Sequence, residues 1–130
     1  MGEQVLHRVL HVEDEEDIRM VTKLALEGPG RFVVESCESG AVALEKALAF
    51  KPDIFLIDVM MPDMDGSATL QAMRGLPAFS DAVVVFMTAR AQPCEIERFK
   101  LLGIAEVIVK PFDPVTLSER MLAIWENRYG

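Results

Sequence analysis

The sequence predicts an α/β fold, a single doubly wound, five-stranded parallel sheet with helices on both faces. Five short apolar runs alternate with amphipathic stretches along the 130 residues. Val83–Phe86 is apolar at every position, which is typical of a strand buried on both sides of a parallel sheet. The length suits one substantial core and no linker is visible, so we expect a single domain over 1–130 with no output domain.

In the first half of the chain, strands are expected at residues 8–12, 32–37 and 53–57, and helices at 15–27 and from 39 to about 50. Ile18, Val21 and Ala25 recur on one face of the first helix, which Gly28–Gly30 ends. Ser39 is expected to cap the second helix. The side chains that this second helix offers for burial are Val42, Leu44 and Leu48, and Pro52 ends it.

In the second half, strands are expected at 82–87 and 105–109, and helices at 65–74, from 93 to 102 and after 113. Pro93 suits the first turn of its helix, and Gly103 ends it. The core face of this helix is expected to be Ile96, Phe99 and Leu102. Asp113–Pro114 predicts the cap and first turn of the last helix, whose buried stripe is Leu117, Met121, Ile124 and Trp125.

Charge and hydropathy exclude several classes of function. A net charge of -8 and a pI near 4.7 disfavour direct binding to nucleic acid, which needs clustered Lys and Arg. No apolar stretch approaches the roughly 18 residues of a membrane span, and no signal peptide is visible, so we expect a cytoplasmic protein with no membrane contact. The two cysteines, Cys37 and Cys94, lack zinc-ligand spacing and are expected to be reduced thiols.

The two histidines, His7 and His11, lie four residues apart on the first strand and therefore on the same face. A histidine pair can bind a metal, but no further ligand stands nearby in the sequence. Packed or partly exposed strand positions are favoured over metal ligands.

Polar residues end four of the five strands: Glu13 and Asp14 after the first, Asp58 at the third, Thr88 at the fourth and Lys110 at the fifth. The carboxyl ends of parallel strands meet at one edge of a sheet. Close carboxylates repel one another, which raises at least one pKa, and a hard cation such as Mg²⁺ relieves the repulsion. An aspartate can form an acyl phosphate, while a lysine and a hydroxyl can hold phosphoryl oxygens. The set therefore suits phosphoryl acceptance on Asp58.

Each residue also has an ordinary structural interpretation. The acidic run Glu13–Asp17 suits a helix start without any metal, Thr88 could enter a helix, and Lys110 could be a solvated charge. Asp63 and Asp65 are favoured as loop and capping residues over metal ligands. Because all these strand-end residues are expected at one edge of the sheet, a shared pocket is favoured over five separate structural roles.

Four motifs together resemble the receiver domain of two-component response regulators over nearly the whole chain. The motifs are His11–Glu15, Ile57–Gly66, Met87–Ala89 and Val109–Phe112. The resemblance implies a flavodoxin-like fold with strand order 2-1-3-4-5. It also implies a cis bond between Lys110 and Pro111.

The resemblance further implies a role for each matching residue. Asp58 would accept the phosphoryl group. The metal, Mg²⁺ or Mn²⁺, would be held by Glu13, Asp14, Asp58 and the backbone carbonyl of Met60. Thr88 and Lys110 would each bind a phosphoryl oxygen.

The chain departs from the family pattern at two positions. Glu13 stands where aspartate is most common and adds a methylene to a metal ligand. Val107 stands where many receivers have Tyr or Phe, and a short side chain that is stiff at χ1 cannot act as the same switch. Arg90 and Met60 flank the pocket at positions that influence phosphoryl lifetime in the family.

These observations predict a phosphoryl-accepting signalling switch and not a turnover enzyme. A histidine kinase or phosphotransfer protein would donate to Asp58, and the added charge would change the surface formed by the fourth helix, fifth strand and fifth helix. The phosphorylated domain would pass the signal on by binding a partner protein, and it could also form a phosphorylation-dependent dimer. The alternatives are a pseudo-receiver that acts only through protein contacts, which Val107 favours, and a phosphatase, for which no general base is evident.

Overall fold

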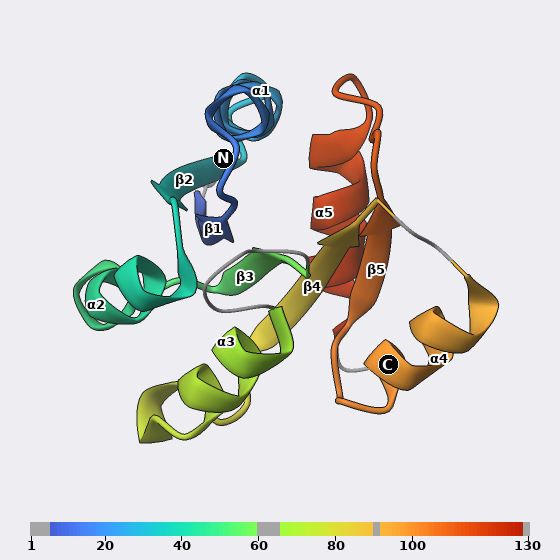
Figure 1. Ribbon diagram of the computed structural model, residues 1–130. Coiled ribbons are helices and arrows are strands. Elements are labelled where there is room, and N and C mark those ends of the chain that lie inside the picture. The colour runs from blue at the N-terminus through green and yellow to red at the C-terminus, as the bar shows by residue number, and fades with distance from the viewer. Residues whose placement is uncertain (1–5, 60–65, 90–91, 129–130) are drawn as a thin grey trace.

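The structure is a computed structural model that describes residues 6–59, 66–89 and 92–128. At its centre is a sheet of five parallel strands in the order β2-β1-β3-β4-β5 (Figure 1). The strands are β1 (His7–Val12), β2 (Phe32–Cys37), β3 (Ile54–Asp58), β4 (Val83–Thr88) and β5 (Glu106–Val109). This topology confirms the predicted fold class and the strand order that the family resemblance implied.

Helices cover both faces of the sheet, as predicted (Figure 1). They are α1 (Glu16–Glu27), α2 (Gly40–Phe50), α3 (Gly66–Arg74), α4 (Pro93–Lys100) and α5 (Leu117–Glu126), with a short 3₁₀ turn, η1 (Pro77–Phe79), before β4. One core cluster joins the sheet to α1 and α5, and the other joins it to α2, α3 and α4. None of the described helices has both the length and the apolar character needed to cross a membrane.

The central strands are buried on both faces. In β3, Leu56 packs in the cluster beneath α1 and α5, while its neighbour Ile57 packs in the opposite cluster. Neither side chain is exposed to solvent. Because successive side chains of a strand point to opposite faces, only a sheet covered on both sides accommodates such a continuous apolar run.

The order of the strands reverses at β1: the chain first adds β2 on one side of it and then crosses to add β3 on the other. In open parallel sheets this arrangement leaves a crevice beyond the carboxyl ends of the two strands on which the order reverses. Here those ends are Val12 of β1 and Asp58 of β3. The acidic residues predicted to act together therefore lie at the position where ligands bind in folds of this class.

The buried face of α1 differs from the prediction. Thr22 and Leu26 are completely buried, Ile18 and Ala25 are only half-buried, and Val21 is 42% exposed. The apolar side chains of α1 are spread over a wider part of the helix surface than the sheet can bury. The helix packs against β2 and α5 through the row that contains Thr22 and Leu26. The apolar periodicity predicted the helix correctly, but the packing against β2 and α5 determines which face of the helix is buried.

The start of α2 is as predicted, but one of its expected core residues is not. The Ser39 hydroxyl accepts a hydrogen bond from the Val42 backbone N–H at 3.2 Å, which is the expected cap. Leu48 is exposed, whereas Ala43 and Ala47 are buried against the sheet. Small alanine side chains let the helix axis approach the strands closely, and this turns Leu48 toward solvent.

The last helix, α5, begins later than Asp113–Pro114 predicted, at Leu117 with Thr116 before it. The Asp113 carboxylate accepts from the Val115 backbone N–H at 2.9 Å, and the Asp113 carbonyl accepts from the Thr116 N–H at 3.3 Å. Asp113 therefore forms a turn of its own ahead of the helix, a common use of an aspartate side chain. The buried stripe was predicted correctly in part, since Leu117 and Met121 are buried and the remaining two residues are partly buried.

Replacing Gly103 with alanine should destabilise the protein by about 3–4 kcal/mol. Gly103 has a φ of +80°, which costs an L-residue about 1–2 kcal/mol. A Cβ there would also lie 2.9 Å from Nη1 of Arg74, whose guanidinium donates to the carbonyls of Leu102 and Gly103. Loss of these bonds adds about 1 kcal/mol each. Urea unfolding of the purified variant measures the loss.

Gly30 provides a matched control for this substitution. Its φ is +81°, but a Cβ there would meet nothing within 4 Å. Gly30→Ala should therefore cost only the backbone term, about 1–2 kcal/mol. Equal losses in the two variants would contradict a stabilising role for the Arg74 hydrogen bonds.

Candidate functional site

The carboxyl ends of the strands bring the predicted site residues together. Glu13 and Asp14 follow β1, Asp58 ends β3 and Lys110 follows β5. Thr88 ends β4, where it pairs in register with Val109 and its carbonyl accepts the Lys110 backbone N–H at 2.8 Å. All five lie at one edge of the sheet because the strands are parallel and in register.

Lys110 links the two buried carboxylates of the site. Its Nζ lies 2.6 Å from Oε1 of Glu13 and 3.1 Å from Oδ2 of Asp58. The lysine side chain is 14% exposed, compared with 0% for Glu13 and 5% for Asp58. Such charge-assisted hydrogen bonds are short and strong, so the ammonium holds both acids in one cluster. This geometry excludes the solvated-charge interpretation of Lys110.

A group that the sequence did not indicate fixes the backbone of the acidic segment. Nη1 of Arg19, one turn into α1, donates to the Glu13 carbonyl at 2.8 Å. On the other side, the Glu13 N–H donates to the Cys37 carbonyl at 2.9 Å, and the Glu13 carboxylate accepts from the Glu15 N–H at 3.3 Å. No single-sequence signal separates Arg19 from other exposed helical arginines, since its role depends on the turn between β1 and α1.

Protonation at this site follows from burial and from the charges in contact. Burial raises the pKa of Glu13 above its ordinary value; the hydrogen bond from Lys110 opposes the rise and the Asp58 carboxylate adds to it. Burial lowers the pKa of Lys110, but its hydrogen bonds to Glu13 and Asp58 outweigh this and leave that pKa raised. Lys110 therefore remains an ammonium, and Glu13 is the acid whose ionised form is costly. The pKa of one clustered acid is raised, as predicted, but the main cause is burial and the repulsion between carboxylates is a smaller one.

Three carboxylates form a set that could hold a metal ion. Ligand atoms of Glu13, Asp14 and Asp58 all lie within 4.8 Å of one another. Asp14 is exposed while the other two are buried, so a cation could keep water molecules on the open side. Mg²⁺ prefers one or two protein carboxylates together with waters and phosphate oxygens. The donor set thus fits the predicted metal; the Met60 carbonyl lies outside the described residues.

The bond between Lys110 and Pro111 is cis, as the family resemblance implied. Thr88 is 1% exposed at the end of β4. Three other positions named from the sequence, Arg90, Asp63 and Asp65, lie outside the described residues.

The histidines occupy the packed positions that were favoured for them. His11 is completely buried on the α1–α5 side of β1, and neither of its ring nitrogens has a hydrogen-bond partner among the described residues. His7 lies against the rings of Trp125 and Phe32, with centroids 5.1 and 6.1 Å away. Neither belongs to the carboxylate cluster that could hold a metal.

A model of the response regulator receiver domain matches residues 9–122 of the chain. The chain belongs to the response regulator receiver family. Receiver domains are signalling switches and not turnover enzymes, and they bind Mg²⁺ in an acidic pocket. This receiver domain has an acidic cluster of three carboxylates, Glu13, Asp14 and Asp58.

The transcriptional regulatory protein CseB of Streptomyces coelicolor is 37% identical over 122 residues, covering 94% of this receiver domain and 50% of CseB. The chemotaxis protein CheY of Bacillus subtilis is 35% identical over 106 residues, covering 82% of this chain and 87% of CheY. The structure of CheY4 from Vibrio cholerae superposes with a TM-score of 0.85 at 29% identity, covering 92% of this chain and 99% of CheY4. The receiver domain spans about half the length of the CseB regulators but nearly all of CheY.

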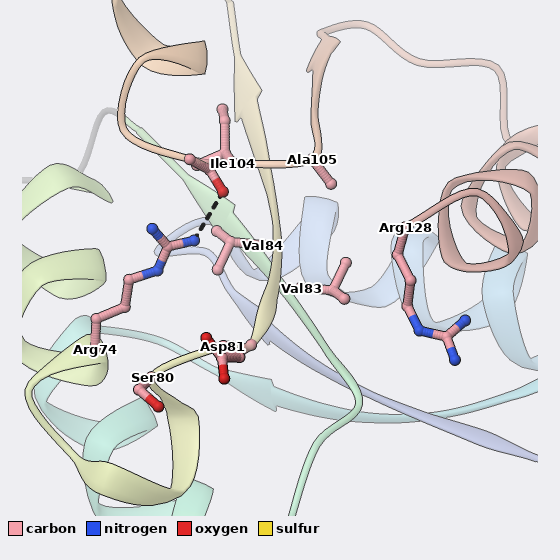
Figure 2. A pocket seen from close by; sticks show the side chains of 10 residues that line it. Arg74, Ser80, Asp81, Val83, Val84, Ile104, Ala105 and Arg128 are labelled. Atoms are coloured by element: carbon pink, nitrogen blue, oxygen red, sulfur yellow. Dashed lines mark hydrogen bonds between the residues drawn. The ribbon is translucent and has the colours of Figure 1, made fainter. Parts of the chain in front are cut away.

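A second hollow lies at the opposite end of the sheet, where β4 and β5 begin (Figure 2). It has a volume of about 540 Å³ and lies between the guanidinium groups of Arg74 and Arg128, with Asp81 at its edge. None of the carboxylates of the acidic pocket lines it. It is therefore separate from the acidic cluster at the carboxyl ends of the strands.

Proposed function

We propose that this receiver domain accepts a phosphoryl group on Asp58 from a phosphohistidine donor. An Asp58 oxygen attacks phosphorus, the P–N bond of the donor breaks, and its electron pair returns to the imidazole nitrogen. The product is an acyl phosphate on Asp58. The observation that carries the proposal is the position of Asp58 at the end of β3, 3.1 Å from the Lys110 ammonium and within the acidic cluster.

Glu13, Asp14, Asp58 and the Met60 carbonyl would hold Mg²⁺, or Mn²⁺ in its place. When bound, the cation supplies positive charge that offsets the charge of the phosphoryl oxygens and the neighbouring carboxylates. The fit rests on three oxygen-donor side chains whose ligand atoms cluster within 4.8 Å. Glu13 contributes a longer side chain than the aspartate common in the family, and this extra length also lets it reach Lys110.

Lys110 and Thr88 would stabilise the phosphorylated state. The Lys110 ammonium already contacts the Asp58 carboxylate, so it can bind one phosphoryl oxygen once Asp58 is phosphorylated. The Thr88 hydroxyl would donate to a second oxygen from the neighbouring strand end. Their movement would change the α4-β5-α5 surface, and with it the binding of a downstream protein or a second copy of the domain.

The donor would be a histidine kinase or a histidine phosphotransfer protein. A part of this receiver domain is 33% identical over 89 residues to the histidine-protein kinase BarA of Escherichia coli, covering 68% of this chain and 10% of BarA. We place the domain in the cytoplasm without direct contact to nucleic acid or membrane, in keeping with its net charge of -8 and two free cysteines.

Incubation with Mg²⁺ and acetyl phosphate should add the mass of one phosphoryl group to the wild-type chain. Asp58→Asn should abolish the gain completely, because an amide cannot form the acyl phosphate. Excess EDTA should reduce the wild-type gain at least tenfold. Intact-mass spectrometry measures all three.

Asp81→Asn is the matched control, since Asp81 lines the hollow at the other end of the sheet. It should gain mass like the wild type. If the wild type gains no mass, or if Asp58→Asn gains as much, the phosphoacceptor assignment is wrong and the pseudo-receiver becomes the better description.

A further inference from the structure

Helix α4 is seated on the sheet by one buried aromatic side chain. Phe99 is 7% exposed, and its ring meets that of Phe86 on β4 edge-to-face, with centroids 5.5 Å apart and planes at 77°. The other two predicted core residues of this segment, Ile96 and Leu102, are only half-buried. The contact between α4 and β4 therefore includes an edge-to-face ring pair, a geometry worth about 0.5–1.5 kcal/mol beyond area burial.

Val107 lies beside this ring pair and leaves room for it. It pairs in register with Phe86, is 5% exposed and belongs to the same core cluster as both rings. No residue of β5 is aromatic, so the ring at this junction comes from α4. A valine has neither the size nor the rotational freedom to carry a movement from the sheet to the surface.

Thr88 lies two residues beyond Phe86 on β4, and the two side chains therefore point to the same face of the sheet. Both are almost completely buried. A displacement of the Thr88 end of β4 would therefore move the Phe86 side chain on the same face, and the Phe86 ring packs against that of Phe99. Because protein interiors are close-packed, the Phe99 ring must shift when Phe86 does.

The carboxyl end of α4, next to Phe99, is held by contacts with α3 and β5. Arg74 of α3 donates to the carbonyls of Leu102 and Gly103 at 2.6 and 2.9 Å. Figure 2 draws the Arg74 side chain with one of these bonds. Nearby, Nζ of Lys100 lies 3.8 Å from the Glu106 carboxylate at the start of β5. A displacement delivered through Phe99 would therefore pivot α4 about its carboxyl end.

We propose that the Phe86–Phe99 pair couples Thr88 to the position of α4, in place of an aromatic residue on β5. The inference rests on phosphorylation of Asp58 as proposed above and adds the route by which that event reaches the surface. In this domain the aromatic side chain that carries the movement is Phe99, which lies in α4 itself. Phe99 is thus a positioning residue for the output surface and does not touch the phosphoryl group.

Cys94 provides a native probe for the test. It is exposed near the start of α4, whereas Cys37 is buried in β2. Burial also raises the pKa of the Cys37 thiol to about 11, so an environment-sensitive maleimide dye at pH 7 should label Cys94 selectively. The dye signal is recorded before and after acetyl phosphate and Mg²⁺, and intact mass is measured on the same samples.

Phe99→Leu should reduce the phosphorylation-dependent dye signal at least fivefold, while its mass gain matches that of the wild type. Phe86→Leu breaks the same pair from the strand side and should give the same loss. The matched control is Phe79→Leu, because Phe79 forms a similar pair with Phe55 at 5.2 Å and 76° and is 6% exposed, but lies in η1 and not in α4. It should retain more than half of the wild-type signal.

Three results would overturn the proposal: a full signal in Phe99→Leu, an equal loss in Phe79→Leu, or a wild type that gains mass without any change at Cys94. Each leaves phosphorylation of Asp58 intact. A wild type that gains no mass overturns the proposed function and the coupling with it. Thermal melts of each variant confirm that the signals compare folded proteins.

Discussion

When the pH falls from 7.5 to 5, the metal-free wild type should lose about 2 kcal/mol more of its free energy of unfolding than the His11→Leu variant loses. Burial, together with the positive charges of Lys110 and Arg19, lowers the pKa of His11 from 6.5 to about 3. The folded state therefore binds this proton less well than the unfolded state. The contribution of His11 to the free energy of unfolding is therefore fully present above pH 6.5 and is lost as the pH falls toward 3.

The raised pKa of Glu13 has the opposite sign. Its folded form holds the proton more tightly, so its contribution declines as the pH rises through its raised value. That titration is present in both the wild type and the His11→Leu variant, and it largely cancels from their difference. Leucine also removes two buried nitrogens that have no partner among the described residues, so the variant should be no less stable than the wild type at pH 7.5.

Urea unfolding from pH 4.5 to 7.5 in the presence of EDTA measures this effect. His7→Leu removes the other histidine of β1 and leaves His11 in place, so it should retain the acid-induced loss of the wild type. Parallel pH profiles for the wild type and His11→Leu would show that the protonation of His11 does not contribute to the loss of stability in acid.

Replacing Lys110 with methionine should destabilise the metal-free protein by about 3 kcal/mol at pH 8. The substitution leaves Glu13 and Asp58 buried without the ammonium that lies 2.6 and 3.1 Å from them. The pKa of Glu13 is already raised by burial and should rise further. The loss should therefore grow as the pH increases and shrink below pH 6, where Glu13 can take up a proton.

The matched control is Lys100→Met, which breaks the exposed pair between Lys100 and Glu106 at 3.8 Å. Exposed pairs contribute about 0–1 kcal/mol, so this variant should lose little at any pH. Urea unfolding at pH 6 and pH 8 separates the two cases. Equal losses for both lysines, or a loss in Lys110→Met that does not change with pH, would show that the buried acids do not depend on Lys110.

Much of the fold could be predicted from local patterns. The strand over 32–37 has the predicted bounds, and Ser39 caps α2 as expected, because apolar runs and capping hydroxyls act within a few residues. Which side chains of a helix reach the core was less predictable. Val21 and Leu48 were expected inside and lie exposed, since the neighbouring elements select the buried face from a wide apolar arc.

The strand-end residues of the site could also be predicted, because a parallel sheet gathers the ends of its strands. The contacts that support them could not. Arg19 holds the Glu13 carbonyl across a turn, and Arg74 holds the loop after α4 from another helix. Neither arginine differs in type or periodicity from an ordinary surface cation, so only the three-dimensional arrangement shows its role.

The sequence by itself determined a parallel α/β fold with Glu13, Asp14, Asp58, Thr88 and Lys110 at one edge, because strand periodicity and strand ends are local properties. Only the tertiary structure decided that Lys110 pairs with a glutamate 97 residues away, and that Phe99 supplies the ring beside Val107. Both depend on distances between elements that are remote in sequence. Such distances are set by packing of the whole core, which no local pattern encodes.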